Sequence, residues 1–261
     1  MVARGTEAFR LLYCDDDDEV IGIDEVQLMD PIPTHRLPKL RALLRDTELS
    51  TVYETTKVLV AWRDEAGFAA LEQILRNDPR QGETVDQHRL HAGDLFYDRL
   101  AEALRFATPY PPGRFPDGPT PAEAEALQNR IVPLVPKLLD RYHIDVFDGN
   151  LNLLLEKLDA ASLSRPTRTA IERTIAVDRA DQASRLLPAL ARMDPALAWD
   201  TIGLFDLDNP DRRIAGEITT ATLIIDTEPA GLLRERLAND PNDAVRDMVN
   251  FACEQWERRI R

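Results

Sequence analysis

A run of acidic residues near the start of the chain is the first candidate for chemistry. Asp15, Asp16, Asp17 and Asp18 are followed directly by Glu19. Carboxylate oxygens bind calcium, but a calcium loop places them at alternating positions around a glycine turn, and this run lacks that spacing. Two other roles are open to it: a solvated turn, and a recognition surface for a basic protein.

Apolar residues flank the acidic run on both sides, in LLY before it and in VIGIDEVQLM after it. Apolar neighbours that pack into a core hold a segment in place, and an ordered segment recognises a partner better than a loose tail. We therefore expect residues 15–19 to bind a protein partner. We extend this expectation to the next two acids of the segment, Asp24 and Glu25.

Two histidines offer a second candidate site. His88 and His91 are three residues apart, with Asp94 one turn further on. This spacing would put two or three metal ligands on one face of a helix. The glutamate and the spacing of the HExxH motif are missing, however. We prefer exposed polar residues beside a loop, and we predict no metal site and no cofactor.

The sequence carries no recognisable catalytic motif. It has no GxSxG, no phosphate-binding GxxxxGK[ST] and no GxGxxG pattern. Its two cysteines, Cys14 and Cys253, are far apart and form no CxxC pair. We therefore assign no catalytic residue and expect a protein that is not an enzyme.

The negative charge is concentrated in one region. The formal net charge is -14, and the stretch from Leu11 to Thr34 contains eight acids with no lysine or arginine. That stretch leaves only -6 for the rest of the chain. A regional charge of this sign attracts a basic protein. It disfavours nucleic acid, because binding to phosphates requires lysine and arginine.

The location of the protein is predicted from what the sequence lacks. No stretch approaches 18 uninterrupted apolar residues, and the first residues contain no apolar segment of signal-peptide length. The two cysteines provide no disulfide framework. We expect a cytoplasmic protein that does not enter a membrane.

Short amphipathic helices, one after another, must position these residues. Leu37, Leu40 and Leu44 recur at helical spacing, and so do Phe68 and Leu71. Thr51-x-x-Glu54 predicts a capping box, and Asn209 with Pro210 predicts the start of a later helix. The stretch EITTATLII is rich in β-branched residues, which favours a strand, but its neighbours favour a helix.

Two recurring features indicate repeated helical hairpins. The tetrapeptides LPKL, VPKL and LPAL begin at Leu37, Val135 and Leu187, and we expect the proline in each to bend a helix. Turn aspartates recur 32 residues apart, at Asp46 and Asp78 and again at 208 and 240. Periods of this size are typical of stacked helical hairpins.

These features resemble the HEAT-repeat family. The resemblance lies in LPKLRALLRDTELSTVYETTKVLVAW and in LLRERLANDPNDAVRDMVNFACEQW, and covers roughly residues 35–78 and 185–256. It implies an all-α fold, a HEAT-like α-α superhelix or right-handed solenoid of about ten to twelve helices. Second helices line the inner curve of such arrays, so the resemblance implies a partner contact for Tyr53 and Glu54.

The middle of the chain departs from this pattern. TPYPPGRFPDGPTP, residues 108–121, is too rich in proline for a helix or a central strand. Long loops in repeat arrays are often functional, so we include Tyr110 and Phe115 among the partner-binding residues. The predicted organisation is an acidic segment 1–34, helical hairpins 35–107, the proline-rich loop 108–121, and helical hairpins 122–261, with a subdomain seam or one continuous solenoid as alternatives.

The expected function is to bind a protein without catalysing a reaction. A small HEAT-like chain with an acidic focus favours an inhibitor or immunity-type protein that masks a basic toxin or enzyme. One alternative is a HEAT-like scaffold or assembly factor without inhibition. Another is a HEAT-like lyase, for which the sequence offers no residue set.

Overall fold

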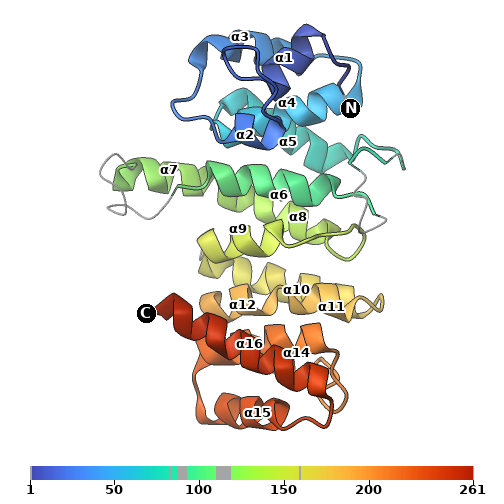
Figure 1. Ribbon diagram of the computed structural model, residues 1–261, viewed down its shortest axis with the longest axis vertical. Coiled ribbons are helices and arrows are strands. Elements are labelled where there is room, and N and C mark those ends of the chain that lie inside the picture. Colours follow the sequence, from blue (N-terminus) through green and yellow to red (C-terminus); the bar gives the residue numbers. More distant parts are fainter. Residues whose placement is uncertain (1, 83, 87–92, 110–118, 159, 261) are drawn as a thin grey trace. The chain divides into compact units, whose positions relative to one another are not determined.

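The protein is helical throughout the described residues, which confirms the all-α prediction. The computed structural model describes residues 2–82, 84–86, 93–109, 119–158 and 160–260 (Figure 1). Within them no strand forms, and Cys14 and Val20 make an isolated antiparallel bridge. The chain divides into two compact units. Unit 1 comprises Met1–Leu138 with Asp145–Leu154, and unit 2 comprises Leu139–Ile144 with Leu155–Arg261.

Unit 1 is organised around one buried helix, α4, which packs against α2, α3, α5 and α6. Helices α8 and α9 contribute residues to both units. The elements of unit 1 are α1 (Glu7–Tyr13), α2 (Ile23–Gln27), the 3-10 turn η1 (Thr34–Arg36), α3 (Leu37–Leu43), α4 (Leu49–Ala61), α5 (Glu65–Asn77), α6 (Phe96–Ala107), α7 (Pro121–Ile131) and η2 (Val132–Leu134), with the shared α8 (Val135–Arg141) and α9 (Asn150–Leu158).

Buried threonines are compatible with the central position of α4. Thr55 and Thr56 are fully buried, and the Thr56 hydroxyl donates to the Val52 carbonyl oxygen at 2.7 Å. A hydroxyl that bonds one turn back satisfies itself inside the helix. The predicted capping box at Thr51 is wrong, because the helix begins at Leu49 and Thr51 is buried in its first turn.

A buried ion cluster connects the segment after α5 to the start of α6 and to the loop between α8 and α9. The Arg80 side chain is 9% exposed, and its guanidinium lies over the rings of Phe96 and Tyr97. It pairs with three carboxylates at 2.9–3.3 Å, those of Asp78, Asp94 and Asp145. A buried cation requires this compensation, because the loss of water around it is costly.

Unit 2 is likewise organised around one central helix, α14, which packs against α11, α12, α13, α15 and α16. Its buried Thr219 and Thr222 bond back into their own helix, at 2.7 and 2.8 Å. The elements of unit 2 are η3 (Ala161–Leu163), α10 (Ser164–Ile175), α11 (Ala180–Ser184), α12 (Leu187–Met193), α13 (Pro195–Ile202), α14 (Arg212–Ile225), α15 (Glu228–Ala238) and α16 (Asp243–Ile260).

The β-branched stretch EITTATLII belongs to α14, so the preference for helix over strand is confirmed. The predicted start of this helix is wrong by two residues. Asp211, rather than Asn209, is the N-cap, and its side chain accepts a hydrogen bond from the Arg213 amide at 2.8 Å. The aspartate side chain satisfies an amide that the first turn leaves unpaired.

The recurring prolines begin helices instead of bending them. Pro38, Pro136 and Pro188 each occupy the second residue of a helix, in α3, α8 and α12. At that position the absent N–H would have had no partner, so proline is tolerated there. The sequence predicted these prolines inside helices, and they lie at the starts of helices instead. Among the described residues, the helices α1 to α16 outnumber the expected ten to twelve, and some of them, such as α2 and α11, are only five residues long.

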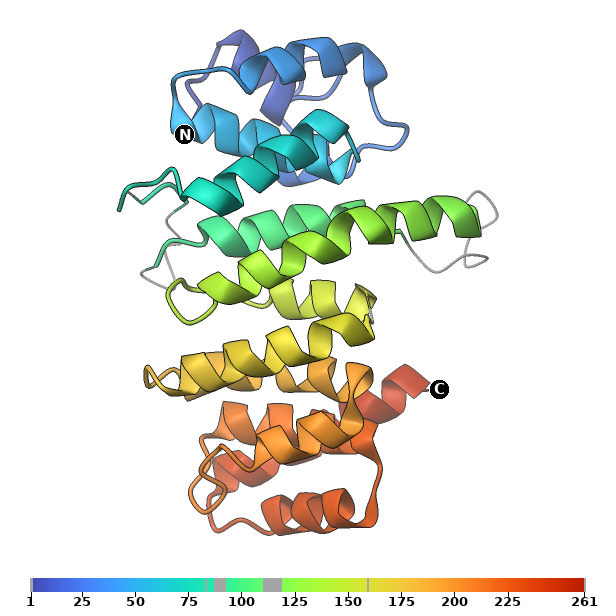
Figure 2. The ribbon, with the colours of Figure 1, turned by 180° about the vertical axis from the view of Figure 1, so that it is seen from behind.

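Helix α7 continues through η2 into α8, as Figure 2 shows from behind. Unit 1 contains residues on both sides of the predicted seam at 108–121, since it extends to Leu138. Among the described helices, none has both the length and the apolar character needed to cross a membrane.

Candidate functional site

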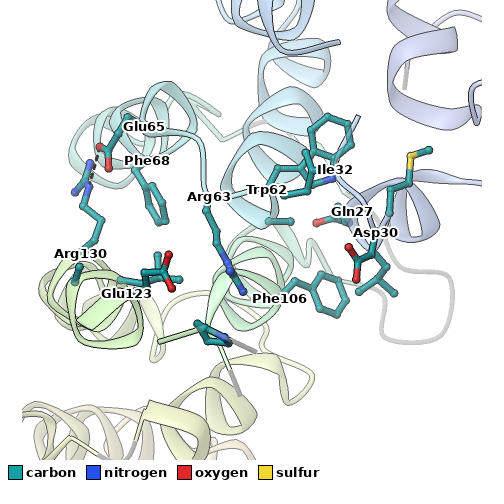
Figure 3. A pocket seen from close by; sticks show the side chains of 16 residues that line it. Gln27, Asp30, Ile32, Trp62, Arg63, Glu65, Phe68, Phe106, Glu123 and Arg130 are labelled. Carbon is teal, nitrogen blue, oxygen red and sulfur yellow. Dashed lines mark hydrogen bonds and ion pairs between the residues drawn. The ribbon is translucent and has the colours of Figure 1, made fainter. Parts of the chain in front are cut away.

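An open groove in unit 1 is a concave feature with a lining of apolar and charged side chains. Its volume is about 820 Å³, within the range of ligand-binding clefts. One wall comes from the acidic segment, a second from the end of α4 and the start of α5, and a third from α7 (Figure 3). Its lining comprises Gln27, Leu28, Met29, Asp30, Ile32, Ala61, Trp62, Arg63, Glu65, Phe68, Phe106, Pro119, Glu123, Ala126, Leu127 and Arg130.

The acidic segment is fixed to the protein core beside this groove. The buried Trp62 indole donates its N–H to the Val26 carbonyl oxygen at 2.9 Å, which holds the end of α2 against the end of α4. The residues that follow α2 then form the groove wall. Leu28 on this wall is 58% exposed, and Asp30 is also exposed. The wall therefore offers an apolar side chain next to a carboxylate.

Helix α7 forms the opposite wall and is held by a charged side chain near its end. The Arg130 guanidinium bonds to Glu65 at 3.3 Å and to Glu72, and it lies 5.0 Å from the centre of the Phe68 ring. The pKa of Glu72 is lowered, chiefly by the hydrogen bond from Arg130. These contacts attach α7 to α5 while leaving most of the α7 surface exposed.

Arg63 extends into the groove from a strained backbone position. Its φ is 62°, in the left-handed region that favours glycine, at the end of α4. The Nε atom donates to the Ala107 carbonyl oxygen at 3.0 Å. Glu123 faces the groove from α7. Its pKa is lowered mainly by hydrogen bonds from Thr120, and the positive charge of Arg63 lowers it further. This carboxylate partly compensates the arginine.

Gln27 is the most deeply buried polar residue of the groove wall, at 3% exposure. Its amide nitrogen makes two long hydrogen bonds, to the Ile23 carbonyl oxygen at 3.4 Å and to the Asp24 carboxylate at 3.3 Å. Its Oε1 atom is buried and accepts no hydrogen bond from any described residue. An unsatisfied buried acceptor is rare in folded proteins and requires an explanation.

The acidic run is a tight turn in which the first two aspartates are structural. The Asp15 carboxylate accepts hydrogen bonds from the amides of Asp17 at 3.0 Å and Glu19 at 2.9 Å. Asp16 pairs with the buried Arg36 at 2.6 Å, and Arg36 also donates to the Cys14 carbonyl oxygen at 2.7 Å.

The partner-binding role predicted for the acidic run therefore falls on its other members. Asp17, Asp18 and Glu19 are exposed, and so are Asp24 and Glu25 on α2. These carboxylates are available to solvent. Asp15 and Asp16 hold the turn in shape, although the Asp16 side chain is also 53% exposed. Whether they contact a partner remains a prediction.

The expectation for Tyr53 is wrong, because its side chain is buried. Tyr53 is 2% exposed, stacks on Phe96, and donates its hydroxyl to the Asp86 carboxylate at 2.9 Å. Helix α6 covers it. Its neighbour Glu54 is half-buried and accepts a hydrogen bond from Tyr13 at 2.5 Å. Burial raises the pKa of Glu54, and the bond from Tyr13 opposes the rise.

Other predicted residues lie outside the site or outside the described residues. Tyr110, Phe115, His88 and His91 belong to the segments that the structure does not describe. Asp94 has a structural role: besides its pairing with Arg80, it accepts hydrogen bonds from backbone amides at 2.9 and 3.2 Å. Across the described part of the chain, no group of three or more His, Cys, Asp or Glu side chains could hold a metal ion.

The groove is suited to binding by apolar contact and ion pairing. Its described lining contains no serine, cysteine, histidine or lysine. Comparison of the chain with protein-family models, with curated proteins and with solved structures found no match. The HEAT resemblance therefore stays a prediction.

Proposed function

We propose that this chain is a non-catalytic protein-binding module that holds a basic, partly apolar segment of another protein in the groove of unit 1. The observation that carries the proposal is the composition of the groove: aromatic and aliphatic side chains form much of its lining, and the carboxylates of Asp30, Glu65 and Glu123 stand among them. Interfaces combine such an apolar centre with a polar rim.

The charge around the groove supports a basic partner. Asp24, Glu25 and Asp30 are exposed on or next to the same wall as Leu28, and the chain as a whole is at -14. The two arginines of the lining are already opposed by carboxylates of the protein itself. Arg63 lies near Glu123, and Arg130 pairs with Glu65. Charge complementarity of this kind speeds association and excludes wrong partners.

The finer form of the proposal is an inhibitor or immunity-type protein whose partner is a basic toxin or enzyme. The exposed Asp17, Asp18 and Glu19 would then steer the partner before the groove engages it. We also propose that the helices within each unit stack as HEAT-like hairpins. Packing of α4 with α5, and of α14 with α15 and α16, supports successive helical hairpins.

The proposal is tested with two tryptophan variants of α7. Ala126 lines the groove and is exposed, so Ala126→Trp fills the groove without entering the core. Asn129 is equally exposed but lies outside the lining, so Asn129→Trp is the matched control. The wild type and each variant serve as bait in an extract of the cells that naturally make this protein. We expect the wild type and Asn129→Trp to retain a basic protein that Ala126→Trp fails to retain.

The electrostatic part is tested separately. Asp24→Asn with Asp30→Asn should weaken capture and reduce its dependence on salt, since Asp30 carries charge on the groove wall and the exposed Asp24 carries charge on the segment that precedes it. Glu235→Gln with Asp247→Asn removes the same charge from exposed sites of unit 2 and should change little. Equal retention by both tryptophan variants would contradict the groove, and an acidic or neutral captured partner would contradict the charge argument.

A further inference from the structure

Gln27 and the acids beside it contain more hydrogen-bond acceptors than the protein itself uses. Gln27 Oε1 is buried without a donor among the described residues, and Gln27 lines the groove. The Asp24 carboxylate lies within hydrogen-bond distance of the same carboxamide, at 3.3 Å. Asp30 lines the same wall (Figure 3). Acceptors in this number predict an occupant that brings several donors.

The charge of this corner specifies which donors fit. Asp30 is an exposed carboxylate on the same wall as Gln27, and the exposed Asp24 carboxylate accepts a hydrogen bond from the Gln27 amide nitrogen. A positively charged side chain suits a carboxylate beside an unsatisfied carbonyl oxygen, because ammonium and guanidinium groups carry three to five N–H donors and no acceptor. Hydrogen bonds to charged groups are also stronger than those between neutral groups.

The apolar neighbours suit the rest of such a side chain. Trp62, Phe106, Met29 and Ile32 line the groove together with Gln27. Lysine and arginine bury their aliphatic stems against apolar surface, and a guanidinium stacks on aromatic rings. Oε1 has almost no exposed area, so an occupant must displace a flexible neighbour to reach it, and Met29 is the unbranched apolar side chain of that wall.

We infer that Gln27 and Asp30 form a subsite for one arginine or lysine side chain of the bound protein segment. The inference rests on the proposed function and names the feature of the partner that the groove selects. Gln27 is then the residue that determines specificity, because its buried oxygen is satisfied only when the cation is in place.

The variant Gln27→Met separates this role from a structural one. Methionine keeps the length and apolar stem of the side chain while removing the unsatisfied oxygen. It sacrifices only two long hydrogen bonds, so the midpoint of urea unfolding should stay the same or rise. Binding of the occupant should weaken by about tenfold or more, because a hydrogen bond to a cation is lost. A structural role would lower the unfolding midpoint instead.

The probe is a seven-residue peptide, selected from a random phage-displayed library on the wild-type protein and then synthesised. We expect arginine or lysine at one fixed position, flanked by apolar residues. Versions with citrulline, arginine or lysine at that position test charge and shape, since citrulline has the shape of arginine without the charge. Citrulline should weaken binding to the wild type by about tenfold or more, because it loses the ion pair with Asp30 while keeping N–H donors for Gln27 Oε1. The difference between arginine and citrulline should shrink on Asp30→Asn.

The outcomes separate the subsite from the groove. Peptides that are lost on Ala126→Trp but carry no fixed cation, or that bind Gln27→Met as tightly as wild type, overturn the subsite and leave the groove standing. Peptides that bind Ala126→Trp unchanged, or failure to enrich any peptide, overturn both the groove and the subsite.

Discussion

Replacement of Gly67 by alanine should force α4 and α5 apart. A β-carbon at this position would stand 2.6 Å from Leu59 Cβ and 2.7 Å from the Val60 backbone nitrogen, where ordinary contact begins at 3.4 Å. The two helices would have to separate by about 0.8 Å. These neighbours are backbone or lie next to it, so they cannot rotate away as the end of a side chain could.

The magnitude follows from two opposing effects. Overpacking of a core costs about 1–3 kcal/mol, and a contact with backbone belongs at the upper end. Alanine in place of glycine within a helix returns up to about 1 kcal/mol. We therefore expect Gly67→Ala to lower the free energy of unfolding by about 2 kcal/mol. Glu65 and Phe68 flank this position and line the groove, so peptide binding should weaken as well.

Gly216→Ala is the matched control. The added carbon would meet Cγ and Sδ of Met248, at 2.8 and 3.2 Å, and a methionine side chain can move. Its free energy of unfolding should stay within about 1 kcal/mol of wild type. Urea denaturation followed by circular dichroism measures both variants. Equal losses in the two variants, or a Gly67→Ala protein as stable as wild type, would refute the argument from close helix approach.

Three further predictions follow from charged groups. Arg80→Met removes the cation shared by three carboxylates and should destabilise the protein by about 3–5 kcal/mol, measured by urea unfolding; a loss under 1 kcal/mol would contradict the buried cluster. Burial raises the pKa of Glu217 from 4.5 to about 7, so its contribution to stability declines as pH rises between these values. At pH 8 Glu217→Gln should therefore be more stable than the wild type, by up to about 3 kcal/mol. Unfolding curves in which the two proteins differ by the same free energy at pH 4 and at pH 8 would contradict this. Asp17→Asn with Asp18→Asn should slow partner association at low salt while leaving the unfolding midpoint unchanged, and an unaltered association rate would limit the run to a solvated turn.

Much of the fold was predictable because it depends on local patterns. The apolar spacing of Phe68 and Leu71 predicted α5, whose end at Asn77 lies in the predicted turn. Helix ends were less predictable. Asn209 and Asp211 are both good caps, and only the packing of α14 selects the second one. Likewise, the sequence around Pro38 is compatible with a bend inside a helix or with the start of a helix, depending on where the preceding turn ends.

The site was only partly predictable because distant segments build it. The sequence indicated that the acidic segment is a candidate site. It did not reveal that the residues after α2 face α7, which lies about a hundred residues later in the chain. Arg63 carries no local signal for a left-handed backbone, and Gln27 reads as an ordinary helix residue. Tyr53 was expected to face a partner because the HEAT resemblance places second helices on the inner curve, and the local pattern of α4 does not reveal that α6 covers this side chain.

The most direct test of the groove is the dissociation constant of the selected peptide for three proteins at physiological salt. Isothermal titration would compare the wild type with Ala126→Trp and Asn129→Trp. The groove predicts that Ala126→Trp weakens binding by about 30-fold or more, because the indole occupies the space of a buried anchor residue worth about 2 kcal/mol, while Asn129→Trp stays within about twofold. Equal affinities for all three proteins would show that the peptide binds elsewhere.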